Sequence, residues 1–130
     1  KLMRVDKVCH LYDDWHDQLL CAKNMHEGDM AIAFSYSGLT REVLDCTVEA
    51  QRHNCPVVAV TKVDGSSKLA TMADAVLGVA ASEPLVRSGA MASRMAQLMV
   101  VDALYAAYVA RDYERATHVI KQNYIEKQER

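Results

Sequence analysis

The stretch MAIAFSYSGLTREVLDCTVEAQRHNCPVVAVT, residues 30–61, contains the alternation that decides the fold. An apolar run at 30–35 is followed by a helical pattern at 39–53 and by a second apolar run at 56–61. One face of the helical pattern is apolar, with Leu39, Val43, Cys46 and Ala50. Short apolar runs rich in β-branched residues are typical of buried strands. The stretch therefore predicts a strand, a helix and a second strand in succession.

The alternation continues on both sides of this stretch. Further strands are predicted at Val8–Tyr12 and at Ala75–Val79, and the C-terminal third is predicted to be helical, at about Gly89–Ala110 and from Asp112 onward. Repeated strand and helix units form right-handed crossovers and a parallel sheet covered by helices on both faces. We therefore expect the α/β class, as a three-layer, flavodoxin-like parallel sheet flanked by helices.

Composition limits the possible functions. The 130 residues, 51% of them apolar, can bury the core of one domain. A net charge of -2 provides no basic field for nucleic acid, so we expect no binding of DNA by this segment alone. We find no apolar run of roughly 20 residues and no leader, so we expect a cytoplasmic protein without a membrane partner.

The metal-binding residue types are scattered along the chain. Four cysteines stand singly and are expected to be buried thiols: Cys9, Cys21, Cys46 and Cys55. The five histidines do not have the spacing of metal ligands. We therefore expect neither a metal site nor a cofactor.

The segment Ser35-Tyr36-Ser37-Gly38-Leu39-Thr40 lies between the first predicted strand of this stretch and its helix. Ligands of open parallel sheets bind beyond the carboxyl ends of the strands, where helix N-termini carry partial positive charge. Gly38 allows a positive φ and close approach of an anion, while Ser35, Ser37 and Thr40 can donate hydrogen bonds. The segment predicts a phosphate site. The alternative is an ordinary turn in which Ser37 or Thr40 only caps the helix.

This segment resembles the Ser-x-Ser-Gly-x-Thr signature of SIS (sugar isomerase) domains, which hold the phosphate of phosphosugars in this loop. The resemblance extends to Gly28-Asp29, to the strand Pro56–Thr61, to a short helix within Ser66–Asp74 and to the order of the elements. The run Arg87–Leu98 narrows the resemblance further, because it resembles the SIS domain of RpiR/MurR-type bacterial transcriptional regulators.

That resemblance implies residues 1–130 are an SIS domain lacking its N-terminal part. The family's first strand and a helix-turn-helix domain are then expected upstream of Lys1, and DNA would be bound only through that absent domain. The implied ligand is a phosphorylated sugar or amino sugar, and homodimers or higher homo-oligomers are expected. An apolar stripe on the predicted long helix could cover both the sheet and a partner subunit: Met91, Met95, Leu98, Val101 and Tyr105, with Met99 alongside.

Three residues outside the loop are candidates for sugar contact or for coupling to the rest of the regulator. Glu83 follows the last predicted strand and could accept bonds from sugar hydroxyls or act as a base, or it could be a solvated loop residue. Arg87 and Arg94 could pair with phosphate, and Arg94 could instead fix helix packing or an interface. Isomerase-type relatives carry a Glu and a Lys at the opening of the following helix, where this chain has Leu85 and Val86.

We therefore predict no catalytic residue and a phosphosugar-sensing domain of a regulator of sugar or amino-sugar metabolism. A phosphosugar isomerase or lyase is the first alternative. A dimerisation module that binds no ligand is the second.

Overall fold

The computed structural model describes residues 1–80 and 90–125. The chain divides into two compact units, one formed by Leu11–Val100 and the other by Lys1–His10 with Val101–Arg130. The predicted phosphate loop belongs entirely to the first unit.

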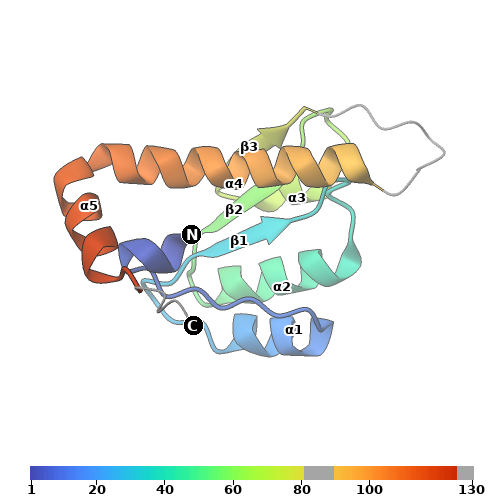
Figure 1. The fold of residues 1–130 in the computed structure, drawn as a ribbon. Helices are drawn as coiled ribbons and strands as arrows, with labels where there is room; N and C mark the ends of the chain where they lie inside the picture. Colours follow the sequence, from blue (N-terminus) through green and yellow to red (C-terminus); the bar gives the residue numbers. More distant parts are fainter. Residues whose placement is uncertain (81–89, 126–130) are drawn as a thin grey trace, which may run out of the picture. The chain divides into compact units, whose positions relative to one another are not determined.

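The first unit is built on a parallel sheet. Its strands are β1 (Ala31–Phe34), β2 (Val57–Lys62) and β3 (Ala75–Val79), in the order β1-β2-β3 (Figure 1). Both pairings are parallel, with Ala31 opposite Val57 and Val58 opposite Ala75. Three of the four predicted strands are thus confirmed, and all three described strands end at the same edge of the sheet.

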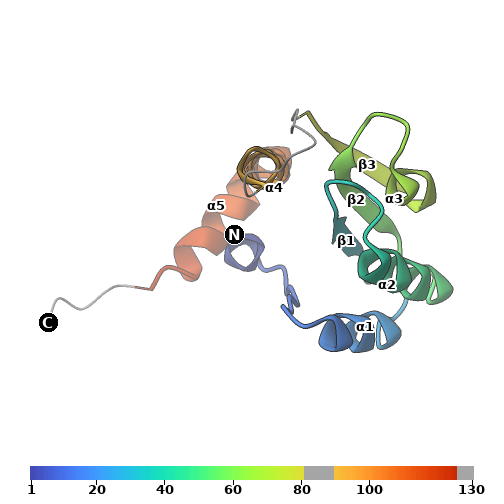
Figure 2. The same cartoon turned by 90° about the vertical axis from the view of Figure 1, so that its right-hand side faces the viewer.

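Helices of this unit flank the sheet. The predicted amphipathic helix is α2 (Arg41–Arg52), which packs against β1 and β2. The short α3 (Lys68–Met72) contacts β2 and α2, and α1 (Trp15–Lys23) packs beside α2. Figure 2 shows α2 and α3 on one face of the strands. The structure therefore has the predicted α/β architecture of parallel strands flanked by helices.

The centre of this unit lies between α2 and the sheet. Ala50 of α2 contacts Cys55 and Val57, all at most 2% exposed, and Ala31 and Ala33 pack against this cluster. Side chains alternate across a strand, so Val60 faces away from this cluster, and it is also buried. Both faces of β2 are therefore covered, which explains why its sequence is a continuous apolar run rather than an alternating one.

The prediction of a strand at Val8–Tyr12 is wrong. These residues form no strand, and Val8 and Leu11 are 83% and 88% exposed. A β-strand needs a neighbour that accepts and donates its ladder of hydrogen bonds, and β1, at the edge of the described sheet, pairs only with β2. Cys9 lies in this exposed run, so it is not the buried thiol that we expected.

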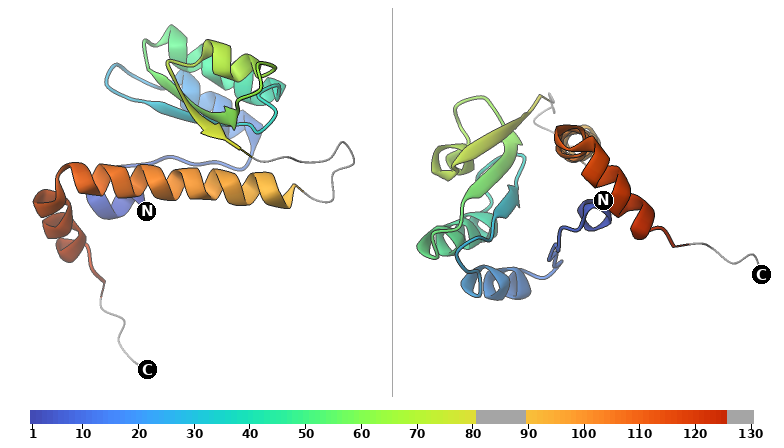
Figure 3. Two further views of the ribbon diagram at one scale, coloured as in Figure 1. Left: turned by 90° about the horizontal axis from the view of Figure 1, so that it is seen from above. Right: turned by 90° about the vertical axis from the view of Figure 1, so that its left-hand side faces the viewer.

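The second unit is helical. It contains the 3-10 turn η1 (Leu2–Val5), the latter part of α4 (Met91–Arg111) and α5 (Tyr113–Gln122), which lies beside η1 (Figure 3). Asp112 caps α5 by accepting a bond from the Arg115 N–H at 3.2 Å. Lys1 forms an ion pair with Asp102. The two predicted C-terminal helices are therefore confirmed over residues 91–122; Gly89 lies outside the described residues. Among the helices of residues 1–80 and 90–125, none has the length and apolarity needed to cross a bilayer.

Candidate functional site

The predicted phosphate loop turns directly from β1 into α2. Ser35 continues the strand by donating its N–H to the Val60 carbonyl at 3.2 Å. The chain then reverses, because the Gly38 N–H donates to both the carbonyl oxygen and the Oγ of Ser35, each at 3.1 Å. Gly38 has φ +66°, the left-handed conformation that we expected of this glycine. The residues from 35 to 40 therefore form one tight turn at the carboxyl end of β1.

The predicted hydroxyl groups are brought together in this turn. Ser35 Oγ and Thr40 Oγ1 lie 2.8 Å apart, and Ser37 Oγ accepts a bond from the Leu39 N–H at 3.3 Å. Ser35 is buried, Ser37 is half-buried and Thr40 is exposed. The bond to Ser37 uses an oxygen lone pair and leaves its hydroxyl hydrogen to a different partner.

The N-terminus of α2 receives no capping hydrogen bond from the side chain of its own N-cap residue. Thr40 is the N-cap residue by position, yet its side chain makes no capping hydrogen bond and contacts Ser35 instead. The capping bond that the ordinary-turn alternative assigned to Thr40 is therefore not made, while binding of a phosphate by this turn stays a prediction. The first N–H groups of a helix have no partner within the helix, and they concentrate partial positive charge at its start. This end of the 12-residue α2 can thus bind an anion.

Residues on both sides of a second turn, which leads from β2 into α3, form hydrogen bonds with the loop. Leu69 donates its N–H to the Gly38 carbonyl at 3.0 Å, and Lys62 donates its N–H to the Tyr36 carbonyl at 3.1 Å. Thr61 Oγ1 donates to the same Tyr36 carbonyl at 3.3 Å. The carbonyl groups of Tyr36 and Gly38 therefore anchor the backbone of the loop to β2 and α3.

Sequence reasoning missed two residues that flank this second turn, Thr61 near the end of β2 and Ser67 at the start of α3. Their hydroxyls lie 2.9 Å apart, and a Cβ on Gly38 would lie 1.8 Å from Ser67 Oγ. A signal was present: Ser66 and Ser67 follow β2 as Ser35 and Ser37 follow β1. Since neighbouring parallel strands end at one edge, polar residues after both strands should meet there.

The lysine that ends β2 is already neutralised. Lys62 Nζ lies 2.7 Å from Asp64 Oδ2. The hydrogen bond from Lys62, together with bonds from the hydroxyl and N–H of Ser66, holds the pKa of Asp64 well below its usual range. Anion binding in this loop would therefore rest on hydroxyl and N–H groups, as the residue types predict.

The other predicted site residues are not joined to the loop by the described contacts. Glu83 and Arg87 lie outside the described residues. Arg94 is on α4 and its side chain is exposed, so burial gives it no need of a charged partner. The predictions for these three residues stay predictions.

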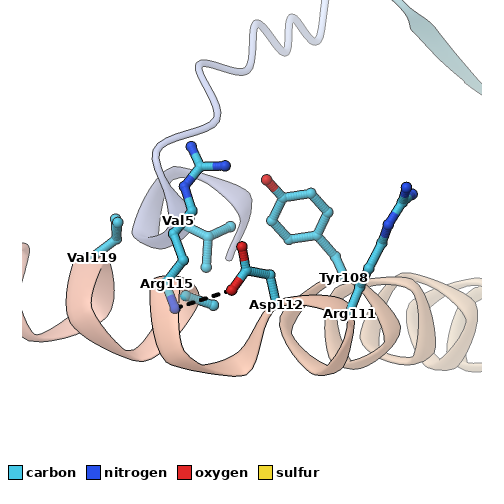
Figure 4. A pocket seen from close by; sticks show the side chains of 7 residues that line it. Val5, Tyr108, Arg111, Asp112, Arg115 and Val119 are labelled. Carbon is cyan, nitrogen blue, oxygen red and sulfur yellow. Dashed lines mark hydrogen bonds between the residues drawn. The ribbon is translucent and has the colours of Figure 1, made fainter.

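A separate cavity of about 410 Å³ lies in the helical unit (Figure 4). It is lined by residues of η1, the end of α4 and α5: Val5, Tyr108, Arg111, Asp112, Arg115, Ala116 and Val119. None of the predicted site residues is among them.

Comparisons with known proteins agree with this architecture. The SIS domain family model matches residues 1–107. An uncharacterized HTH-type transcriptional regulator of Caldanaerobacter subterraneus is 40% identical over 113 residues, which are 87% of this chain and 40% of that protein. The chain thus spans less than half the length of this curated relative.

Two solved structures are similar. The Vibrio vulnificus NanR protein complexed with ManNAc-6P has a TM-score of 0.82 and 28% identity, over 93% of this chain and 45% of the other. The sugar isomerase domain of the RpiR transcription factor from Sphaerobacter thermophilus shares the fold, with a TM-score of 0.71 and 23% identity over 93% of this chain and 65% of the other. With the family model covering most of its length, this chain belongs to the SIS domain family.

Proposed function

We propose that this chain is the phosphosugar-binding effector domain of a DNA-binding transcriptional regulator of sugar or amino-sugar metabolism. The observation that carries the proposal is the loop of residues 35–40, in which hydroxyl groups converge on the start of a helix whose N-cap side chain, Thr40, makes no capping bond. Such a site suits a phosphate group because it offers many donors and needs no metal.

The relatives support the role of a sensor. The similar full-length protein is named an HTH-type transcriptional regulator, and NanR is complexed with ManNAc-6P, a phosphosugar. A ligand that acts through a regulator must bind two arrangements of the protein with different affinity. We place this coupling at α4, where the exposed Arg94 lies beside an apolar stripe.

The pairing of subunits is part of the proposal. Met91, Met95, Leu98 and Met99 form one stripe on α4, and each is between 65% and 71% exposed. A contiguous apolar stripe of this kind is a common feature of subunit interfaces. We assign it to a homodimer contact, which would carry the effect of the ligand from one protomer to the other.

A binding screen tests the proposed function. The intact protein would be titrated by calorimetry with ManNAc-6P, N-acetylglucosamine 6-phosphate, glucose 6-phosphate and fructose 6-phosphate, beside a Ser37→Ala variant and a Thr71→Ala control on the exposed face of α3. One phosphosugar should bind to the native protein and the control, and more weakly to Ser37→Ala. Product analysis of the same samples should recover the sugar unchanged, whereas turnover would favour the isomerase alternative. Lack of binding by every sugar would favour the dimerisation module.

A further inference from the structure

Two buried hydroxyl groups flank the turn from β2 to α3, and neither belongs to the predicted ligand set. Thr61 is 0% exposed and Ser67 is 3% exposed, and their oxygens lie 2.9 Å apart. Ser67 is also the N-cap of α3, since its Oγ accepts the Ala70 N–H at 3.1 Å. Because these hydroxyls are buried, they can affect a ligand only through the residues that they hold.

The hydrogen bonds of these groups have a single consistent direction. A backbone N–H can only donate, and a carbonyl can only accept. Thr61 uses its one hydroxyl hydrogen for the Tyr36 carbonyl, so the hydrogen between the two side chains must come from Ser67. The result is a chain of donors from the Ala70 N–H through Ser67 and Thr61 to the Tyr36 carbonyl. Bonds linked in this way polarise and strengthen one another.

This chain of hydrogen bonds sets the orientation of a peptide group in the phosphate loop. The Tyr36 carbonyl points toward β2 because it accepts from both Thr61 Oγ1 and the Lys62 N–H. Cis peptide bonds are absent from the described residues, and in a planar trans peptide the N–H points opposite to the carbonyl. The N–H of Ser37 is therefore turned away from β2 and from the partners of the Tyr36 carbonyl.

Gly38 fits the same arrangement. A Cβ on Gly38 would lie 2.6 Å from Ser67 Cβ and 2.9 Å from Thr61 Oγ1, so the loop backbone rests directly on this hydroxyl pair. The Gly38 carbonyl accepts from Leu69 N–H in the first turn of α3. The start of α3 and the phosphate loop thus form one connected hydrogen-bonded unit.

We infer that Thr61 and Ser67 are positioning residues for phosphosugar binding, an inference that rests on the proposed function. They hold the Tyr36–Ser37 peptide group with its N–H outward before a ligand arrives. Preorganisation of this kind raises affinity because less ordering remains to be done on binding.

The test compares Thr61→Val with Thr61→Ser in the intact protein. Valine has nearly the shape of threonine but lacks the hydroxyl, whereas serine keeps it. Thr61→Val removes the one hydroxyl bond to the loop, and losing one neutral hydrogen bond changes an equilibrium constant by about tenfold at most. Thr61→Val should therefore raise the Kd for the bound sugar of the panel by up to about tenfold, while Thr61→Ser stays within about twofold. Thr71→Val, which removes an exposed threonine hydroxyl of α3, should leave the Kd unchanged.

The readout separates positioning from general destabilisation. The Kd is measured well below the unfolding temperature, where a moderately destabilised variant is still folded, so a merely structural role would not alter it. Equal Kd values for Thr61→Val and the native protein would overturn the inference, and so would equal weakening by Thr61→Ser. If Thr61→Val does not fold, Ser67→Gly removes the donor to Thr61 while keeping an acceptable N-cap. Thr61 then keeps its own bond to Tyr36 but loses the partner that polarises it, so the Kd should still rise, by about threefold, and an unchanged Kd would overturn the inference.

A second measurement does not depend on the ligand. In ¹H–¹⁵N spectra of the unliganded protein, the amide signals of Ser37 and Gly38 should move in Thr61→Val and stay near their native positions in Thr61→Ser. If the native protein binds none of the sugars, the proposed function fails while these shifts still decide the role of Thr61. If binding is found but these signals and the Kd are unchanged in Thr61→Val, only the positioning role fails.

Discussion

Replacing Gly38 with alanine should strongly destabilise the domain. The expected loss in the free energy of unfolding has two parts. The first part is conformational, because Gly38 has φ +66° and a non-glycine residue in this region costs about 1–2 kcal/mol. The second part is steric. The new methyl group would lie 1.8 Å from Ser67 Oγ and 2.6 Å from Ser67 Cβ, so Ser67 must move.

Moving Ser67 breaks the bonds that it makes. Loss of its N-cap interaction with Ala70 costs about 1 kcal/mol, and loss of its bond to Thr61 costs about 1 kcal/mol more. Together with the backbone strain, Gly38→Ala should lower the free energy of unfolding by about 3–4 kcal/mol, a large fraction of the 5–15 kcal/mol of a typical domain. For a chain of this size the midpoint of thermal unfolding should fall by roughly 10 °C or more.

Gly65→Ala is the matched control for this experiment. Gly65 has a similar φ of +79°, but a Cβ there would meet nothing within 4 Å. Urea unfolding of the native protein and both variants should therefore show a loss of about 1–2 kcal/mol for Gly65→Ala and about twice that for Gly38→Ala. If the two losses are equal, the contact between the phosphate loop and Ser67 does not constrain residue 38, and the steric part of the reasoning is refuted.

Three further predictions concern other parts of the chain. The bonds from Lys62 and Ser66 depress the pKa of Asp64, so its stabilising contribution is fully present above the unfolded aspartate value of about 3.9 and declines as the pH falls below it. Asp64→Asn should therefore be less stable than the native protein at pH 7 in denaturant titrations, and the difference should shrink steadily as the pH falls below about 4. Burial raises the pKa of the Cys55 thiol, whereas Cys9 is exposed, so a thiol reagent at pH 7.5 should label Cys9 well before Cys55; mass spectrometry showing the reverse order would contradict the described burial. Met95→Glu places a charge in the exposed stripe of α4 and should convert a homodimer to monomers in light scattering after gel filtration, whereas an unchanged mass would remove this stripe from the interface.

Local patterns predicted the central elements because those elements satisfy their requirements locally. The helix at Arg41–Arg52 needs only an apolar face and a charged one, and both are visible at the 3.6-residue period. The strand at Val57–Lys62 is buried on both faces, so its apolar run alone indicates it. The same reasoning failed at Val8–Tyr12, because an apolar run does not specify which strand will pair with it.

The sequence by itself determined the parallel α/β order, the position of the predicted phosphate loop and the need for glycine at residue 38. Only the tertiary structure decided how the loop is held. Thr40 could cap α2 or bond to Ser35, and the residue types do not distinguish these two local alternatives. Thr61 reaches the Tyr36 carbonyl across 25 residues of chain, a contact that exists only because β1 and β2 lie side by side in register and end at the same edge of the sheet.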